Sequence, residues 1–179
     1  MSTIYLMEAA NLFCGDHDPT KSKHLTLTDL KLPTLEERFV EHMPGGGRAQ
    51  IEVGLGIINK LVPSFKLAGW DPDLLAEFGL GSRARNVFTA YGVIRDKRTG
   101  GALEAKAVIE GRLGKVDGAA FRRGELQSHD YVINEVMHYE LFFNDRRKFY
   151  FDFFTNAWEV DGVNEFGDVN RILRIPATA

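Results

Sequence analysis

A short stretch of the sequence carries four residues that could bind a metal ion, His129, Glu135, His138 and Glu140. Imidazole and carboxylate groups are common zinc ligands. The stretch reads as a β-strand, in which residues an even number apart share a face, so the first two lie on one face and the last two on the other. A compact metal site needs all its ligands around one point. We therefore expect no metal and no cofactor here.

The segment "CGDHD" places Cys14 near His17 and could suggest a Cys–His nucleophile. Residues this close together in a Gly/Asp-rich turn rarely reach the required hydrogen-bond geometry, and no third group orients the histidine. We interpret the segment as a solvated turn and expect no catalytic residue. A β-fold hydrolase that uses His129 or His17 stays open as an alternative, and it predicts an activity that is lost when one histidine is changed.

Glycine and arginine residues offer two possible anion sites. The segment "GGGRAQIEVGLG" has the glycine content of a phosphate-binding loop, but it lacks the Lys-Ser/Thr pair and the following helix. The pairs Arg122–Arg123 and Arg146–Arg147 lie near predicted turns, where arginines are usually solvated charges. Neither feature predicts phosphate binding.

Composition limits the partners that the chain could bind. It has 22 Lys and Arg against 25 Asp and Glu, a net charge of -3, and no basic stripe, so we expect no tight binding of nucleic acid, only transient exposure to it. Cys14 is the single cysteine, which excludes an internal disulfide. Its thiol is either an ordinary one or a covalent link to another subunit.

The sequence shows no pattern of membrane insertion or secretion. The N-terminus lacks a basic leader with an apolar run, and the aromatic cluster "FYFDFF" is far shorter than the roughly 18 apolar residues that span a bilayer. We therefore expect a protein made in the cytoplasm of its producing cell, with no membrane partner.

The first half of the chain alternates extended segments with one helix. Residues 24–33 predict a strand with a bulge near Asp29, residues 34–42 a more polar extended segment, and residues 59–70 a further one. "DPDLLAEFG" predicts a helix, because Asp71 can cap it and Pro72 suits its first position. Its buried face is predicted to consist of Leu74, Leu75 and Phe78.

The second half reads as β-structure. Segments 86–96 and 102–116 predict a hairpin, and segments 129–143 and 146–154 predict another one around the turn "ND". One face of the 102–116 strand, the dry face, is predicted to be buried. It consists of Leu103, Ala105, Ala107, Ile109 and Leu113. Phe149, Phe151 and Phe153 are predicted to line one side of the last strand, with Tyr150 and Phe154 on the other, so that it needs cover on both faces. "RILRI" predicts a short strand before a frayed tail.

The fold class that follows is mainly β: an antiparallel β-sandwich or barrel with one short flanking α-helix, formed by a single domain, residues 1–179. The chain is of the length of one domain. We expect an extended N-terminal arm, a long loop over residues 34–55 and a C-terminal tail.

The glycine-rich stretch from Glu41 to Gly56 raises the question of what orders it. Fixing one backbone residue costs about 1–2 kcal/mol, and this stretch has few side chains that could offset that cost. We therefore predict that a partner provides the contacts, and that the interface includes the residues at its centre, Met43, Pro44, Gly45, Gly46, Gly47 and Arg48.

Several segments, in this order, resemble the major tail tube protein of contractile-tailed bacteriophages. They are "NLF", "LTLTDLKLPTLE", "MPGGGRAQIEVGLG", "FKLAGWDPDLLAEFG", "RDKRTGGALEAKAVIEGRLGKVD" and "EVDGVNEFGDVNRILRI". The resemblance covers nearly all of the chain. The aromatic run "FYFDFFTNAW", Cys14 and a few extra C-terminal residues depart from the family pattern.

The resemblance implies a structural virion protein without enzymatic activity. Six copies would form a ring, and rings would stack into the inner tail tube, the conduit for DNA ejection. The loop that matches Thr34 to Leu55 would reach neighbouring subunits or the next ring. The implied partners are further copies of the chain, the tail sheath protein, the tape measure protein in the lumen, the baseplate hub, the tail terminator and genomic DNA in transit. The implied location is the virion tail, assembled in the host cytoplasm.

Two further alternatives stay open at this point. The first is the tube of a DNA-free contractile device, a tailocin or a secretion-related injector, which neighbouring capsid and terminase genes would distinguish from a phage tail. The second is a soluble β-barrel module with a ligand inside, which predicts a monomer with a measurable pocket.

Overall fold

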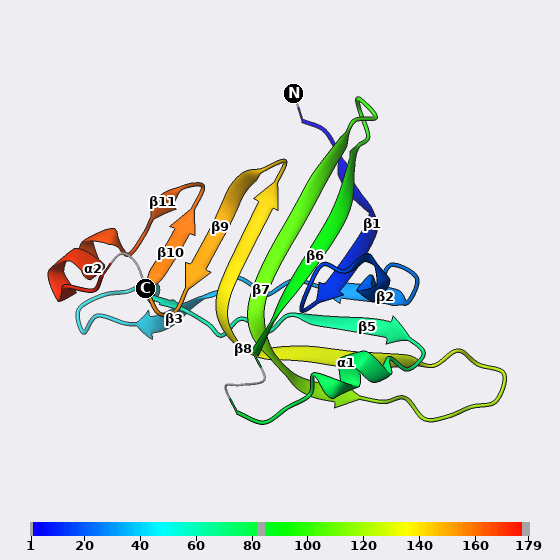
Figure 1. Cartoon of the computed structure of the whole chain (residues 1–179). Coiled ribbons are helices and arrows are strands. Elements are labelled where there is room, and N and C mark those ends of the chain that lie inside the picture. The colour runs from blue at the N-terminus through cyan, green and yellow to red at the C-terminus, as the bar shows by residue number, and fades with distance from the viewer. Residues whose placement is uncertain (1, 82–84, 177–179) are drawn as a thin grey trace.

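The computed structural model describes residues 2–81 and 85–176 and is mainly antiparallel β-structure (Figure 1). Within this part of the chain the elements are β1 (Tyr5–Cys14), a 3₁₀ turn (Pro19–Lys21), β2 (Leu27–Lys31), β3 (Glu37–His42), β4 (Ile51–Ile58), β5 (Ser64–Ala68), α1 (Pro72–Ala76), β6 (Arg85–Asp96), β7 (Ala102–Asp117), β8 (Ser128–Phe143), β9 (Arg146–Asp152), β10 (Ala157–Val160), β11 (Val163–Asn164) and α2 (Gly167–Leu173).

Nine of these strands form one curved sheet in the described part of the chain. Its main path runs β1-β6-β7-β8-β9-β10-β11, and β5 joins it by pairing with the start of β8, while β2 pairs with β5. Two pairings explain the curvature: β8 is bonded to β5 over residues 128–132 and to β9 over residues 138–143. Glu135, between these two parts, has a positive φ of 51°, which bends the strand.

The curved sheet encloses one core between its β1-β6-β7 part and the β2-β5 layer. Phe65 of β5 stacks on Tyr131 of β8, with ring centroids 5.1 Å apart. The predicted dry face of β7 is confirmed for Ala105, Ala107, Ile109 and Leu113, which are buried, while Leu103 is half-buried. The fully buried large apolar side chains are Leu12, Phe65, Leu67, Leu74, Phe88, Ile109, Leu113, Tyr131, Ile133 and Tyr139.

Local signals placed several elements correctly. The bulge expected near Asp29 appears as a register shift between Leu27 and Asp29 against β5. Both residues of the "ND" turn, Asn144 and Asp145, have positive φ, as a two-residue hairpin turn requires. The carboxylate of Asp71 caps α1 by accepting the Leu74 N–H at 3.0 Å.

Helix α1 is shorter than the predicted pattern, and this changes its buried face. It ends at Ala76, so Phe78 falls outside it and is 46% exposed, contrary to the prediction, whereas Leu74 is buried. Similarly, β9 ends at Asp152, so the prediction that Phe153 continues the face of Phe149 and Phe151 is wrong. Phe153 and Phe154 lie in the following turn and are exposed.

The C-terminal region differs most from the expectation. "RILRI" is not a strand, because residues 171–173 belong to the second helix, α2. The Asn170 side chain holds this helix to the body: its Nδ2 donates to the carbonyls of Thr155 (3.1 Å) and Asn156 (3.0 Å). A packed helix therefore replaces part of the predicted tail, and the fold has two helices in its described part rather than one.

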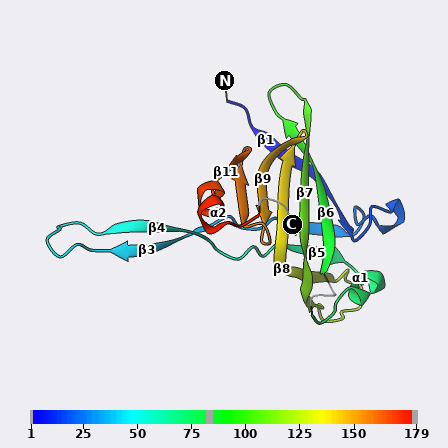
Figure 2. The same cartoon turned by 60° about the vertical axis from the view of Figure 1, so that its left-hand side comes forward.

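The N-terminal arm is also part of the sheet. β1 pairs with β6 from Tyr5 to Cys14 and forms the edge of the main path. The segment 34–55, expected to be a long loop, is mostly a two-stranded ribbon of β3 and β4 that projects from the body (Figure 2). Antiparallel pairing thus satisfies the backbone groups of the two strands that point toward each other, while the outer edge of each strand stays unpaired.

Candidate assembly interface

The ribbon of β3 and β4 has one apolar face. Val40 pairs with Val53 and His42 pairs with Ile51, so these four side chains share a face, and Leu55 continues the alternation. The apolar members of this set are between 41% and 54% exposed. The ribbon stands clear of the body in Figure 2, so the rest of the described chain does not cover this face. An uncovered apolar face of this kind is typical of a protein interaction surface.

The opposite face of the ribbon is acidic. Glu41 and Glu52 pair directly across the strands, and Gln50 Nε2 donates to a carboxylate oxygen of Glu41 at 2.6 Å. Phe39, on the same face, lies against Gly54. Directly opposed like charges destabilise a strand pair, so this face is better suited to meeting a cation than to facing water alone.

The turn of the ribbon holds the residues predicted as an interface, Met43, Pro44, Gly45, Gly46, Gly47 and Arg48. It is closed by a hydrogen bond from the Gly47 N–H to the Pro44 carbonyl at 3.0 Å. None of the three glycines has a positive φ, and a Cβ at Gly45 or Gly46 would meet no atom within 4 Å. A Cβ at Gly47 would collide with the Pro44 ring, so the turn of the subunit requires glycine at Gly47 but not at Gly45 or Gly46.

The main sheet leaves an edge open at β1. Ile4, Tyr5, Leu6 and Met7 are exposed along this edge. At the other end the path closes with the short β10 and β11. Open edges of this kind pair readily with further strands.

The face of the main sheet that points away from the core is polar and rich in ion pairs. Ion pairs join Arg95 to Glu8 at 3.0 Å, Arg112 to Glu135 at 3.2 Å and Arg147 to Glu159 at 2.5 Å. Lys106 instead lies over the rings of Tyr91 and Phe142, 5.9 and 5.7 Å from their centroids. Most basic groups of this face are thus already engaged within the subunit.

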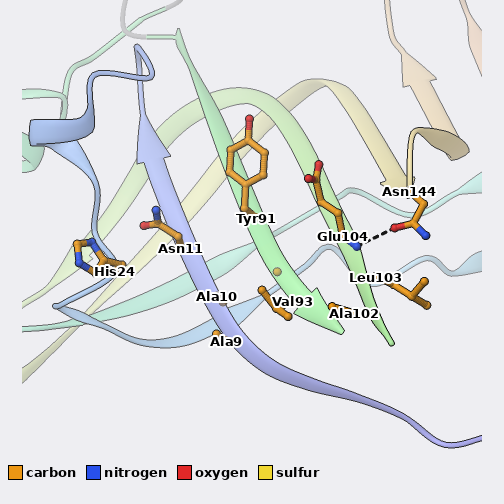
Figure 3. Close-up of a pocket in the computed structure, with 11 residues that line it drawn as sticks. Ala9, Ala10, Asn11, His24, Tyr91, Val93, Ala102, Leu103, Glu104 and Asn144 are labelled. Atoms are coloured by element: carbon orange, nitrogen blue, oxygen red, sulfur yellow. Dashed lines mark hydrogen bonds between the residues drawn. The ribbon is translucent and has the colours of Figure 1, made fainter. Parts of the chain in front are cut away.

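A shallow groove of about 560 Å³ crosses this face over β1, β6 and β7 (Figure 3). Small residues such as Ala9 and Ala10 form part of its lining, and Asn11 and Tyr91 stand beside them. At its other side the Asn144 side chain accepts the Glu104 N–H at 2.8 Å. The groove is open and mostly apolar, and it brings together no group of acids, bases and nucleophiles.

The four residues considered as metal ligands do not meet. His129 is buried, lies against Trp70 with the two rings tilted and their centroids 4.0 Å apart, and accepts the Ala119 N–H at Nδ1. His138 lies elsewhere on β8, between the carboxylates of Glu140 (3.4 Å) and Asp152 (3.2 Å). Within residues 2–81 and 85–176 no group of three or more His, Cys, Asp and Glu side chains is arranged to hold a metal ion.

In the "CGDHD" segment the side chains of Cys14, His17 and Asp18 each contact different groups and form no common site. Cys14 is buried in the core and burial raises the pKa of its thiol to about 12, which favours an ordinary thiol over an intersubunit link. His17 contacts the rings of Phe13 and Tyr91 rather than the thiol. Asp18 caps the following 3₁₀ turn by accepting the Thr20 N–H at 2.9 Å.

The arginine pairs differ in their surroundings. Arg147 bonds Glu159 and lies over the Tyr150 ring, 4.3 Å from its centroid, while Arg146 bonds Asp161 at 3.6 Å. Among the described residues the guanidinium of Arg122, in the loop between β7 and β8, forms one ion pair, a long contact of 3.9 Å with Glu125. The arginines of the loop between β7 and β8 are therefore less engaged within the subunit than those of the turn between β8 and β9.

The apolar face of the ribbon was missed at the level of sequence. The signal was present, because Ile51, Val53, Leu55 and Ile57 alternate with Glu and Gly. The three preceding glycines suggested a flexible loop. For this reason the alternation of apolar residues at every second position, which is typical of a strand, was not interpreted as one. No helix in the described residues is long and apolar enough to cross a membrane.

Comparison with known proteins assigns this chain to a family. A search of curated proteins gave no match. One similar solved structure is the PVC sheath–tube complex of an extracellular contractile injection system in the extended state, with 9% identity and a TM-score of 0.49 over 72% of this chain and 86% of that chain. The family of the phage tail tube protein FII matches residues 11–173. The chain therefore belongs to the phage tail tube protein FII family and is a structural component of a tail tube.

Proposed function

We propose that this protein polymerises as stacked hexameric rings into the inner tube of a contractile phage tail, and that DNA passes through this tube during ejection. The single observation that carries the assembly part is the β3–β4 ribbon. It projects from the body, and Val40, Ile51, Val53 and Leu55 are not covered by any other part of the chain that the structure describes. Further copies of the chain provide that cover.

The open edge at β1 supports the formation of rings. An edge strand of one copy can extend the sheet of the next, and a closed ring of such sheets has no free edge left. Head-to-tail contacts close into a ring when their rotation fits a whole number of subunits, whereas contacts between rings continue into a filament. The interface at Met43–Arg48 would then lie between subunits or between rings.

The polar face of the main sheet suits the wall of a DNA conduit. Arg95, Arg112 and Arg147 are held by carboxylates of the same subunit, so they have little free charge for phosphates. A wall with few free cations gives little gain from counterion release, so DNA adheres to it only weakly. We propose that this face lines the lumen.

The remaining partners follow from the same role. We propose that the outer surface contacts the tail sheath protein, that the tape measure protein occupies the lumen before ejection, and that the ends of the tube contact the baseplate hub and the tail terminator. Assembly takes place in the host cytoplasm. No catalytic step is part of this function.

Electron microscopy of the purified full chain tests the proposal. We expect six-fold rings or tubes, and a monodisperse monomer at high concentration would contradict it. A variant in which Asn-Gly replaces Pro44–Arg48 retains a compact turn for the ribbon. We expect it to melt cooperatively like the parent and to form no tubes, because the tip contacts lie in the assembly.

A further inference from the structure

The loop of residues 118–127, between β7 and β8, is an ordered and exposed protrusion. Its ends are tied down, since the Ala119 N–H donates to His129 Nδ1 at 3.1 Å. Gln127 Nε2 donates to the carbonyls of Arg122 (2.8 Å) and Glu125 (2.7 Å), which fixes the turn at its tip. The loop thus has a defined shape without being buried.

This loop presents apolar and basic groups together. Phe121 is 83% exposed and Leu126 is 79% exposed. Arg122 makes the long contact with Glu125, and Arg123 makes no ion pair within residues 2–81 and 85–176. A surface of exposed apolar side chains beside free arginines is typical of a docking site for an acidic, apolar partner.

The β3–β4 ribbon has the complementary properties. Its apolar face offers Val40 and Val53, and its other face offers the directly opposed Glu41 and Glu52. Neither Glu41 nor Glu52 forms an ion pair with a base within residues 2–81 and 85–176. Arginine from another chain would relieve the repulsion between the two carboxylates.

The two surfaces lie on opposite sides of the subunit. Figure 1 shows the ribbon of β3 on one side of the main sheet and the loop between β7 and β8 extending on the other. One subunit therefore cannot bring its own ribbon to its own loop. Complementary patches on opposite sides form head-to-tail contacts, which repeat from copy to copy.

We propose that the β3–β4 ribbon of one copy docks on the 118–127 loop of a second copy, with Glu41 and Glu52 receiving Arg122 and Arg123. Strands of this length reach roughly 20–25 Å, at about 3.3 Å per residue, which is enough to cross to a neighbouring subunit. The inference rests on the proposed function and adds the partner surface that the ribbon recognises.

Charge reversal tests the pairing. The double variant Glu41→Arg, Glu52→Arg should lose tube formation, as should Arg122→Glu, Arg123→Glu. Combining all four changes restores opposite charges and the parent net charge, and tubes should return. The matched control combines Glu41→Arg, Glu52→Arg with Lys31→Glu, Lys60→Glu, which restores only the net charge, so it should stay unassembled. Equal recovery by both combinations, or by neither, would overturn the proposal.

Disulfide trapping in assembled tubes gives an independent readout. In the chain that carries both Glu52→Cys and Arg123→Cys, oxidation should produce a ladder of trimers and larger species. Each copy then has one thiol in its ribbon and one in its loop, so it can be linked to two neighbours. Either single change should give dimers at most. Tubes of the double variant that yield no ladder would overturn this inference and leave the proposed function standing. Failure of the parent chain to form rings would instead overturn the proposed function.

Discussion

Lys23 and Asp71 form an ion pair of 2.5 Å, with side chains only 12% and 14% exposed. The pair joins the segment after β1 to the start of α1, because the other oxygen of Asp71 caps that helix. Asp71 is thus both a helix cap and the counter-charge of a nearly buried lysine, two roles that can be separated by substitution.

Changing Asp71→Asn should keep the cap but leave Lys23 without its counter-charge. Removing one partner of a buried pair costs about 3–5 kcal/mol, and Asp71→Ala should cost about 1 kcal/mol more through loss of the cap. Urea unfolding of the unassembled subunit measures both changes. The double variant Lys23→Met, Asp71→Asn should regain much of the loss, and equal instability of single and double variants would contradict this account.

Cys14 should be unreactive in the folded protein. Burial raises the pKa of its thiol to about 12, so almost no thiolate exists near neutral pH, and the thiolate is the reactive form. We expect slow alkylation by iodoacetamide at pH 8 in the native state and rapid alkylation in urea. Non-reducing gels of assembled tubes should show monomers, and a covalent dimer would establish the intersubunit link instead.

The Asp96 carboxylate should make the stability of the folded state decrease as the pH falls. The Thr3 hydroxyl and the Arg98 N–H donate to its carboxylate and lower its pKa to about 2. A lowered carboxyl pKa stabilises the folded state above the unfolded value near 4, and this stabilisation is lost as the pH falls through about 2. The stability difference between the parent and Asp96→Asn should therefore shrink on acidification. An NMR titration midpoint near 4 for Asp96 would contradict it.

Two glycine substitutions should have opposite outcomes. A Cβ at Gly111 would lie 2.7 Å from Ile133 Cγ2 and 3.0 Å from the Asn134 carbonyl oxygen. Gly111→Ala should therefore cost about 1–3 kcal/mol in unfolding free energy by overpacking. Gly45→Ala, where nothing lies within 4 Å, should be neutral or stabilise by up to about 1 kcal/mol. If Gly45 serves close approach between copies, this second variant should nevertheless assemble less well.

The apolar face of the ribbon can be tested without disturbing the core. Val53→Glu changes an exposed position, so the unfolding free energy should stay within about 0.5 kcal/mol of the parent while tube formation is lost. Leu67→Glu is the comparison, because Leu67 is fully buried in β5 and its change should abolish folding. Normal tubes from Val53→Glu would show that this face is not an interface.

The features that were readable from sequence are those set by near neighbours in the chain. The Asn144–Asp145 turn needs residues that tolerate positive φ, and the cap of α1 needs a side-chain acceptor at Asp71. The dry face of β7 follows from strict alternation over a long strand. Each of these depends on a few adjacent residues, so each could be predicted.

The C-terminal helix and the bend of β8 depend on contacts between residues that are distant in the sequence. The C-terminal helix is held by Asn170 bonds to the carbonyls of Thr155 and Asn156, which local propensity does not indicate. The bend at Glu135 divides β8 between β5 and β9 and so closes the core.

The sequence alone was enough to predict a mainly β chain that resembles the tail tube family, and it led to the prediction that a partner binds the glycine-rich stretch. That this stretch is a projecting ribbon with Glu41 directly opposite Glu52 could be seen only in the folded chain. Register between two strands depends on both of them at once, and a shift by one residue exchanges their faces. For this reason the apolar and acidic faces of the ribbon could be identified only once the pairing of the two strands was known.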